Sequence, residues 1–287
     1  MPDADPRPSL GRSRWGWWLV GMVCLVLGLG LLRLAYPMYR QQQIVAELLV
    51  RGFKVDRFPY FDHAWPEWMT KRTDQLVIQG ASVTMIDHES GDSDDLQLAS
   101  ELLALTYNDS SHPPSSDLML VNVQATDAGW AHLSGARSLR HLRVVNSTIT
   151  EANLACVDKL PLLSLMLRDT SVTDSDLAGL QSLTTLTYLD LSQNRITDEG
   201  LVHLETLTAL EELLLDDTLI TARGLTHLLK LTRLRELRLA GSKVSDAAVP
   251  ILKRLTMLKT LALDRTRVTR KGYAEVQAAL PDVDVSW

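Results

Sequence analysis

Apolar residues recur in a fixed pattern from Leu118 to the C-terminus: L-x-x-L-x-L, a short polar turn, then a second apolar group. In one copy, Leu189 and Leu191 alternate with polar residues, which predicts a short strand with one buried side. Leu201 and Leu204 follow at helical spacing, which predicts a short helix after that strand. The pattern returns after 24 residues, and seven copies can be aligned up to the end of the chain.

No single copy can bury its leucines alone, so the copies are expected to stack into an α/β solenoid. Parallel strands would form a curved sheet on the concave side, and short helices would cover the convex side. With about six apolar side chains per copy at ~1.5–3 kcal/mol each, stacking would contribute roughly 9–18 kcal/mol before chain entropy is counted. Thr197 is placed to cap one helix, with Asp198 and Glu199 near its positive end.

These copies resemble the leucine-rich-repeat family, specifically the bacterial 24-residue type with the unit L-x-x-L-x-L-x-x-T-x-[IV]-T-D-x-G-L. The resemblance covers residues 118–287 and implies a binding role for the concave face. The family's turn asparagine is present only as Asn194, and Thr or Ser stands in its place elsewhere. Because a hydroxyl can still bond nearby backbone groups, a weaker ladder of turn hydrogen bonds is expected. Residues 40–68 also resemble the anchor-plus-cap preamble of membrane-attached bacterial members.

An uncharged apolar run from Trp17 to Leu32 predicts a transmembrane helix over residues 15–36. Arg33 is close enough to one end to reach the headgroups, and aromatic residues flank both ends of the run. The alternative is a cleaved signal peptide, but no small-x-small cleavage site follows the run. Arginines are nearly balanced around the helix. A short basic tail before a long domain favours a single-pass protein with the repeat domain on the exported side.

The remaining N-terminal regions are more varied. Residues 1–14 are polar and proline-containing, which predicts a disordered tail. Residues 38–75 contain a predicted amphipathic helix (40–51), a short strand near 53–56 and an aromatic group that either caps the solenoid or contacts lipid or a partner. Residues 76–117 are interpreted as a degenerate first unit, with an apolar stretch at 83–86, a helical one at 94–105 and a surface loop over 108–117.

Charge and motifs exclude several functions. The net charge of −6 gives no basic stripe for nucleic acid, so no nucleic-acid partner is expected. The two cysteines fit neither a disulfide framework nor a zinc site. No nucleophile elbow, phosphate-binding loop or paired-histidine motif occurs, so the chain is predicted not to be an enzyme and to need no cofactor or small-molecule substrate. One convex column is interpreted as surface decoration, because metal ligands must converge at about 2–2.3 Å from one point. This column consists of His132, Cys156, His203 and His227.

The outward strand positions are therefore the candidate site. Acidic residues gather in the middle of this face at Asp190, Glu212, Asp216 and Asp217, with arginines on either side. The hypothesis is a partner-binding surface, and the alternative is a solvated sheet whose neighbouring charges pair with each other. The alternative at the level of function is a structural envelope protein that self-associates, or packs on lipid through its aromatic cap. The candidate partner-binding residues are Arg143, Met166, Arg168, Tyr188, Asp190, Glu212, Leu214, Asp216 and Arg238.

Overall fold

The computed structural model describes residues 40, 43–44, 46–47, 54–57, 81–86, 116–123 and 127–287. Of residues 54–57, 81–86 and 116, only the backbone is described. The predicted tail (1–14), the membrane helix (15–36), most of the cap region, the helical stretch 94–105 and the loop 108–115 lie outside the described residues. Among the residues that are described, no helix is both long and apolar enough to span a bilayer.

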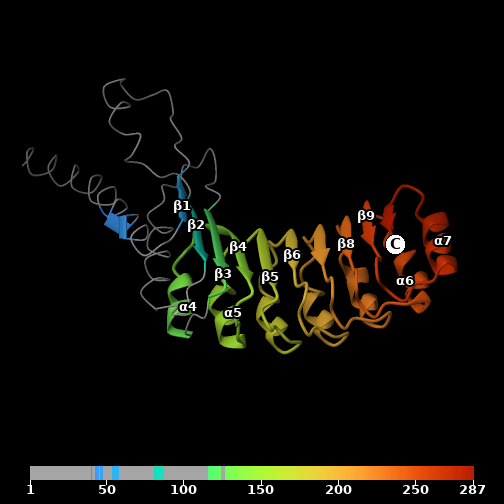
Figure 1. Cartoon of the computed structure of the whole chain (residues 1–287), viewed down its shortest axis with the longest axis horizontal. Coiled ribbons are helices and arrows are strands. Elements are labelled where there is room, and N and C mark those ends of the chain that lie inside the picture. Colours follow the sequence, from blue (N-terminus) through green and yellow to red (C-terminus); the bar gives the residue numbers. More distant parts are fainter. Residues whose placement is uncertain are drawn as a thin grey trace, which may run out of the picture.

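The described strands form one ten-stranded sheet in which each strand lies beside the next in sequence order (Figure 1). The first pair is antiparallel and all later pairs are parallel, with leucines 24 residues apart in register. This arrangement confirms the predicted parallel sheet. The strands are β1 Lys54–Arg57, β2 Ala81–Ile86, β3 Ser116–Val121, β4 Leu139–Val145, β5 Ser164–Arg168, β6 Tyr188–Asp190, β7 Glu212–Leu214, β8 Glu236–Arg238, β9 Thr260–Ala262 and β10 Asp284–Ser286.

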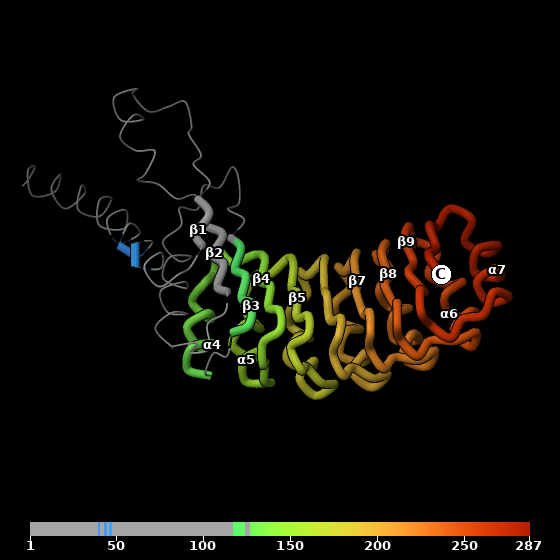
Figure 2. Tube along the Cα trace, viewed as in Figure 1, coloured from blue at the N-terminus to red at the C-terminus, as the bar shows by residue number. Residues whose placement is uncertain are grey.

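Short helices run along the opposite side of the array from the strands, as the successive turns of the trace in Figure 2 show. The central units contain 3₁₀ helices (η) where ordinary short helices were predicted. Only five to seven residues are helical in each of these units, and 3₁₀ geometry is common in such short pieces. The helices are α4 Asp127–Leu133, α5 Glu151–Val157, η1 Asp176–Leu180, η2 Gly200–Leu204, η3 Gly224–Lys230, η4 Asp246–Ala248, α6 Val249–Leu252 and α7 Arg270–Ala279.

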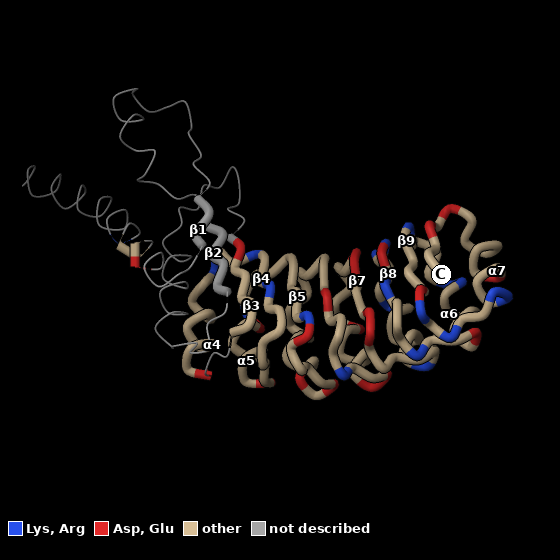
Figure 3. Tube along the Cα trace, viewed as in Figure 1, with Lys and Arg blue, Asp and Glu red and all other residues tan. Residues whose placement is uncertain are grey.

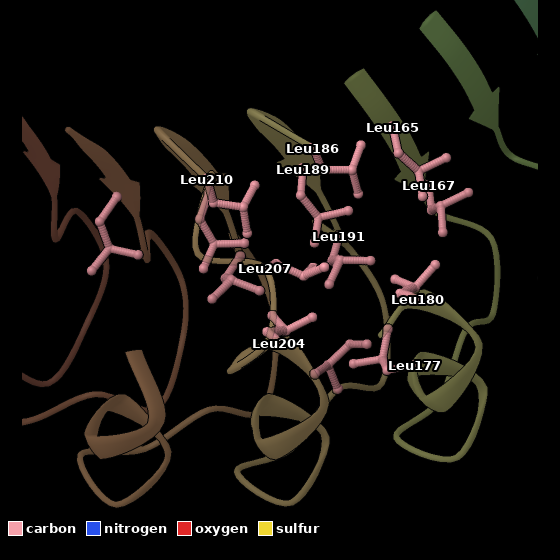
Figure 4. Close-up of a cluster of buried hydrophobic side chains, with 14 of the residues drawn as sticks. Leu165, Leu167, Leu177, Leu180, Leu186, Leu189, Leu191, Leu204, Leu207 and Leu210 are labelled. Carbon is pink, nitrogen blue, oxygen red and sulfur yellow. The ribbon is translucent and has the colours of Figure 1, made fainter. Parts of the chain in front are cut away.

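The core is a continuous stack of leucines between the strands and the helices (Figure 4). Leu189 and Leu191 from β6 and its turn are 0% exposed, as are Leu201 and Leu204 from η2. The equivalent leucines of the units on both sides pack against them. The predicted inward positions are therefore confirmed, and each unit depends on its neighbours for burial.

A ladder of hydrogen bonds joins the helix starts of neighbouring units. Asp174 Oδ1 accepts from the Thr197 backbone N–H at 2.8 Å, and Asp174 Oδ2 accepts from the Thr197 hydroxyl. Asp198 and Thr221 repeat this pair one unit later, as do Asp246 and Thr269 further on. Thr197 is not at the N-cap of η2, which begins at Gly200 with Glu199 at the N-cap, but its hydroxyl does accept from the Glu199 N–H at 3.3 Å.

Threonine side chains cap the N-termini of the helices α5 and α7. The Thr150 side chain accepts from the Asn153 N–H at the start of α5, and the Asn153 side chain accepts from the Thr150 N–H in return. Thr269 accepts from the Gly272 N–H at the start of α7. The same Thr position therefore caps the α-helix in the units of α5 and α7. In the units of η2 and η3 its hydroxyl bonds the preceding unit and also accepts from the backbone N–H two residues later.

The turn after β6 is organised by Asn194, which is 5% exposed. Its Oδ1 accepts from the Thr170 and Val172 N–H groups of the preceding unit at 3.0 and 3.1 Å. Hydroxyl residues in the same slot mostly bond within their own unit: Thr218 donates to the Leu215 carbonyl at 2.7 Å. Ser147 keeps one bond to the preceding unit, because its Oγ accepts from the Val123 N–H at 2.9 Å. The ladder is therefore present but weaker, as expected, since no hydroxyl makes both bonds that Asn194 makes.

The C-terminal end of the array is covered by α7 and β10 (Figure 1). The Trp287 ring stacks on Tyr273 of α7 with a centroid distance of 5.4 Å, and Trp287 Nε1 donates to the Val268 carbonyl at 2.8 Å. These contacts place aromatic side chains beside the C-terminal unit of the array.

At the N-terminal end, β1 confirms the predicted short strand near 53–56, and β2 contains the predicted apolar stretch. The described residues between 40 and 47 are helical, and Ile44 is fully buried, as an amphipathic helix requires. The predicted loop over 108–117 ends too late, because β3 already begins at Ser116. Asp117 belongs to β3, where it lies in register with His141 and its carboxylate pairs with Arg143.

Candidate functional site

The concave face, defined here as the surface made by the outward-pointing side chains of β3 to β9, is the candidate site. Each strand buries alternate residues, so the others form columns across the sheet. Tyr188, Glu212 and Glu236 are register neighbours in one column, and Met166, Asp190 and Leu214 in the next. The structure therefore brings the predicted site residues onto one surface, although they differ greatly in exposure.

The N-terminal part of this face carries Arg143 and Arg168. The Arg143 guanidinium lies 3.3 Å from the Asp117 carboxylate, and His141 Nε2 lies 4.0 Å from the same group. Arg168 is exposed, and its Nε donates to the Gln193 side-chain carbonyl at 3.0 Å. Both arginines are thus held by neighbouring side chains, yet 44% of the Arg143 side chain remains open to solvent.

Asp190 departs from the expected exposed acidic patch. It is only 1% exposed, and its Oδ1 accepts from the Ser192 N–H at 2.9 Å. The longer Met166 and Leu214 side chains stand on either side of it in register, so Asp190 forms part of the floor of the face. Sequence alternation gives the side of the sheet on which a residue lies but not its depth.

Asp216 and Arg238 pair with each other. Asp216 Oδ2 accepts from Arg238 Nε at 2.8 Å, and Asp216 Oδ1 accepts from the Ala240 N–H at 2.8 Å. The hydrogen bond to Asp216 is the main cause that raises the pKa of Arg238. For these two residues the structure shows the neighbouring ion pair of the alternative interpretation.

The pKa values of two neighbouring residues on this face, Tyr188 and Glu212, are raised. Burial first, and then the carboxylates of Asp190, Glu212 and Glu236, together raise the pKa of Tyr188 to about 12. Burial also raises the pKa of Glu212, with added repulsion from Glu236 and Glu211. Figure 3 shows the acidic positions on β7 beside the mixed charges of β8.

Asp217 was grouped with this acidic set, but it belongs to the turn after β7. Its φ of 54° places it in the left-handed region, and its Oδ1 accepts from the Arg265 guanidinium at 3.0 Å, two units away. Gly241 lies between them in the same turn position, with φ of 70°, and a Cβ there would clash with the Asp217 carboxylate. The missing side chain of Gly241 therefore lets Arg265 reach Asp217.

The convex column contains polar pairs. His227 Nδ1 lies 2.7 Å from Glu205 Oε1, and Lys230 bonds the other oxygen of the same carboxylate. His203 Nδ1 contacts the Gln181 amide. Within the described part of the chain, no group of three or more His, Cys, Asp or Glu side chains is arranged to hold a metal ion.

The comparisons with known proteins agree with this geometry. Residues 182–204 match the family model described as Leucine Rich repeat. The fold is similar to the crystal structure of an internalin C2 from Listeria monocytogenes, with a TM-score of 0.51 and 21% sequence identity, over 71% of this chain and 79% of that one. Residues 182–204 therefore form a leucine-rich repeat, and the fold as a whole resembles a leucine-rich-repeat solenoid. At this identity the likeness shows the fold alone. No curated protein matches the chain.

Two residues of the face were absent from the candidate set. Glu236 lies in register with Glu212, and a comparison of equivalent slots 24 residues apart would have singled it out. Asp117, which holds Arg143, was assigned to the preceding loop, since the first unit lacks the full leucine pattern that marks the later strands.

Proposed function

We propose that this protein is a membrane-anchored binding module that holds a partner protein on its concave face. The observation that carries the proposal is a continuous parallel sheet whose open side presents partly exposed Met166, Tyr188 and Leu214 beside charged residues. Solenoids commonly bind through such extended surfaces, and aromatic and methionine side chains are enriched in protein interfaces. The proposal includes no catalytic step.

The anchor is part of the same proposal. Residues 15–36 would cross the membrane once, and the repeat domain would lie on the exported side. The support comes from the length and apolarity of the run and from its flanking aromatic residues. The aromatic region 53–68 lies largely outside the described residues, so its role as a cap, or as a lipid-packing or self-associating surface, stays a prediction.

A capture experiment with full-length protein in detergent tests the binding site. The concave variant Met166→Glu/Leu214→Glu places charge on partly exposed apolar positions, whereas reversing Asp190 or Asp216 would disrupt buried bonds and unfold the sheet. The control Val202→Glu/Met257→Glu adds the same charge at exposed positions outside the strands, which are 43% and 53% exposed. Circular dichroism checks that both variants are folded.

We expect proteins captured from native membranes by the wild type and by the control to be lost from the concave variant. Equal capture by all three forms would contradict a concave binding site. Capture lost only in the control would move the site away from the sheet.

A further inference from the structure

The charges over β6 to β8 are unbalanced. Among the described residues of these three strands and their turns, the concave face carries four carboxylates and one guanidinium, that of Arg238. Arg238 is bonded to Asp216, and nearby Arg235 lies 3.6 Å from Glu211. The four carboxylates are those of Asp190, Glu212, Asp216 and Glu236.

Glu212 and Glu236 oppose each other directly. They are register partners on adjacent parallel strands, and strands in a sheet lie about 4.8 Å apart. Like charges in such pairs destabilise a sheet. Neither side chain has a hydrogen bond or an ion pair with any described residue that would offset this repulsion.

Asp190 gives an independent reason to expect a ligand at this position. Its carboxylate is 1% exposed, yet its one hydrogen bond within the described chain is from the Ser192 N–H to Oδ1. No described residue donates a hydrogen bond to the second oxygen, Oδ2, which is not fully buried, although a carboxylate offers about four acceptor sites. A buried charge with so few donors favours the approach of a cation or a donor group.

Tyr188 completes the surroundings of Asp190. It lies in register with Glu212, and its phenol is electrostatically coupled to Asp190, Glu212 and Glu236. An aromatic ring beside carboxylates attracts guanidinium and ammonium groups. A metal ion is a poorer fit, because no three acidic, histidine or cysteine side chains converge in the described residues.

We propose that the partner of the concave face presents a Lys- or Arg-containing extended segment, and that one of its cationic side chains sits over Asp190 among Tyr188, Glu212 and Glu236. This inference rests on the proposed function and names the chemistry of its partner. The solvent-exposed atoms of Met166 and Leu214 would contact the apolar stem of that cationic side chain or of its neighbours in the partner. The charge complementarity is local, since Arg143 and Arg168 make the N-terminal part of the same face basic.

The test uses a phage library of random 12-residue peptides panned against the full-length protein in detergent. The selected peptides are then measured against the variant Glu212→Gln/Glu236→Gln by fluorescence anisotropy. The matched control Glu199→Gln/Asp282→Asn removes the same formal charge at exposed positions away from the concave face.

We expect the selected peptides to contain Lys or Arg, to bind the Gln variant at least about tenfold more weakly, and to bind the control as they bind the wild type. Peptides that lose binding to Met166→Glu/Leu214→Glu but not to the Gln variant would overturn this inference while leaving the concave binding site in place. Peptides indifferent to both variants would overturn the inference as well, and the capture experiment decides the proposed function separately.

Stability provides a second readout that does not need a ligand. The pKa of Glu212 is raised in the folded state, so the folded protein loses stability as pH rises through that pKa. Replacing Glu212 by Gln should therefore raise the melting temperature at pH 7, with the gain disappearing at acidic pH, where the carboxyl is protonated in both states. A lower melting temperature at pH 7 would show that the carboxylate supports the fold, and would contradict the proposal.

Discussion

Asn194 shows at the scale of one residue how neighbouring units are joined. Its buried side-chain amide accepts hydrogen bonds from two backbone N–H groups of the preceding unit and donates hydrogen bonds to the Leu167 and Leu191 carbonyls. A threonine in the same slot, as at Thr218, has a hydroxyl that bonds the Leu215 carbonyl of its own unit. Asn194 therefore stabilises the contact between its own unit and the preceding one more than a threonine in the same slot does.

Replacing Asn194 by Thr should lower the free energy of unfolding by about 1–3 kcal/mol, because the Thr170 and Val172 N–H groups would be left buried without an acceptor. Urea unfolding monitored by circular dichroism measures the change. The comparison variant Thr218→Val removes one hydrogen bond at the equivalent slot and should cost less, about 0.5–1.5 kcal/mol. Equal losses in the two variants would refute a special role for Asn194.

Residue depth is where sequence reasoning fell short. The alternation of Leu189 and Leu191 with polar residues correctly placed Asp190 on the outward side of the sheet. Its burial depends on the size of the side chains in register on β5 and β7, which alternation within one strand does not reveal.

At the scale of the elements, the Thr-Asp ladder explains why glycine follows it in some units. A Cβ at Gly200 would clash with the Asp174 carboxylate of the preceding unit, and Gly224 and Gly272 are related in the same way to Asp198 and Asp246. One unit replaces the aspartate by Ala222, and the next unit then carries Ala248 in the glycine slot. In these units the space left by glycine is thus the space that the preceding aspartate fills. The slot after Asp127 differs, because Asn153 stands there and donates to the Asp127 carboxylate at 2.8 Å.

This relation predicts coupling between Asp174 and Gly200. Gly200→Ala alone should destabilise the protein by about 1–3 kcal/mol through overpacking against the carboxylate. With Asp174→Ala already present, the same change should cost less, giving a coupling free energy of about 0.5–3 kcal/mol in a double-mutant cycle. Gly179→Ala is the control, because the atom nearest to its Cβ would be Leu154 Cβ at 3.3 Å and no carboxylate would be in contact. Simple additivity of Asp174→Ala and Gly200→Ala would contradict the packing account.

The elements themselves were largely predictable, because the 24-residue period directly reports the strand register. Helix type and capping were less so. A Thr-Asp pair before an apolar run is the signature of a helix start, but the same side chains can reach the preceding unit when the helix is a short 3₁₀ turn. Thr269 makes the same bond to the preceding unit although it caps the α-helix α7, so the sequence pattern does not distinguish the two helix types.

At the scale of the whole molecule, the sequence predicts a chain anchored at one end with an open binding surface. If residues 15–36 are an uncleaved anchor, the protein purified from membranes should have the mass of the full chain and should stay in the pellet after alkaline extraction. Leu25→Arg/Leu27→Arg should release it, because two charges at the centre of the span oppose insertion. A mature protein that lacks the apolar run would instead indicate a cleaved signal peptide.

The central claim is that the concave face contacts a partner protein in the cell. Photo-crosslinking tests it most directly, with a benzophenone amino acid placed at Leu214 on β7 or, in a second form, at Val202 on η2. Both side chains reach solvent, and they lie on opposite sides of the array. The account predicts that a discrete protein adduct forms from position 214 and not from position 202. Adducts from position 202 alone, or identical adducts from both positions, would contradict it.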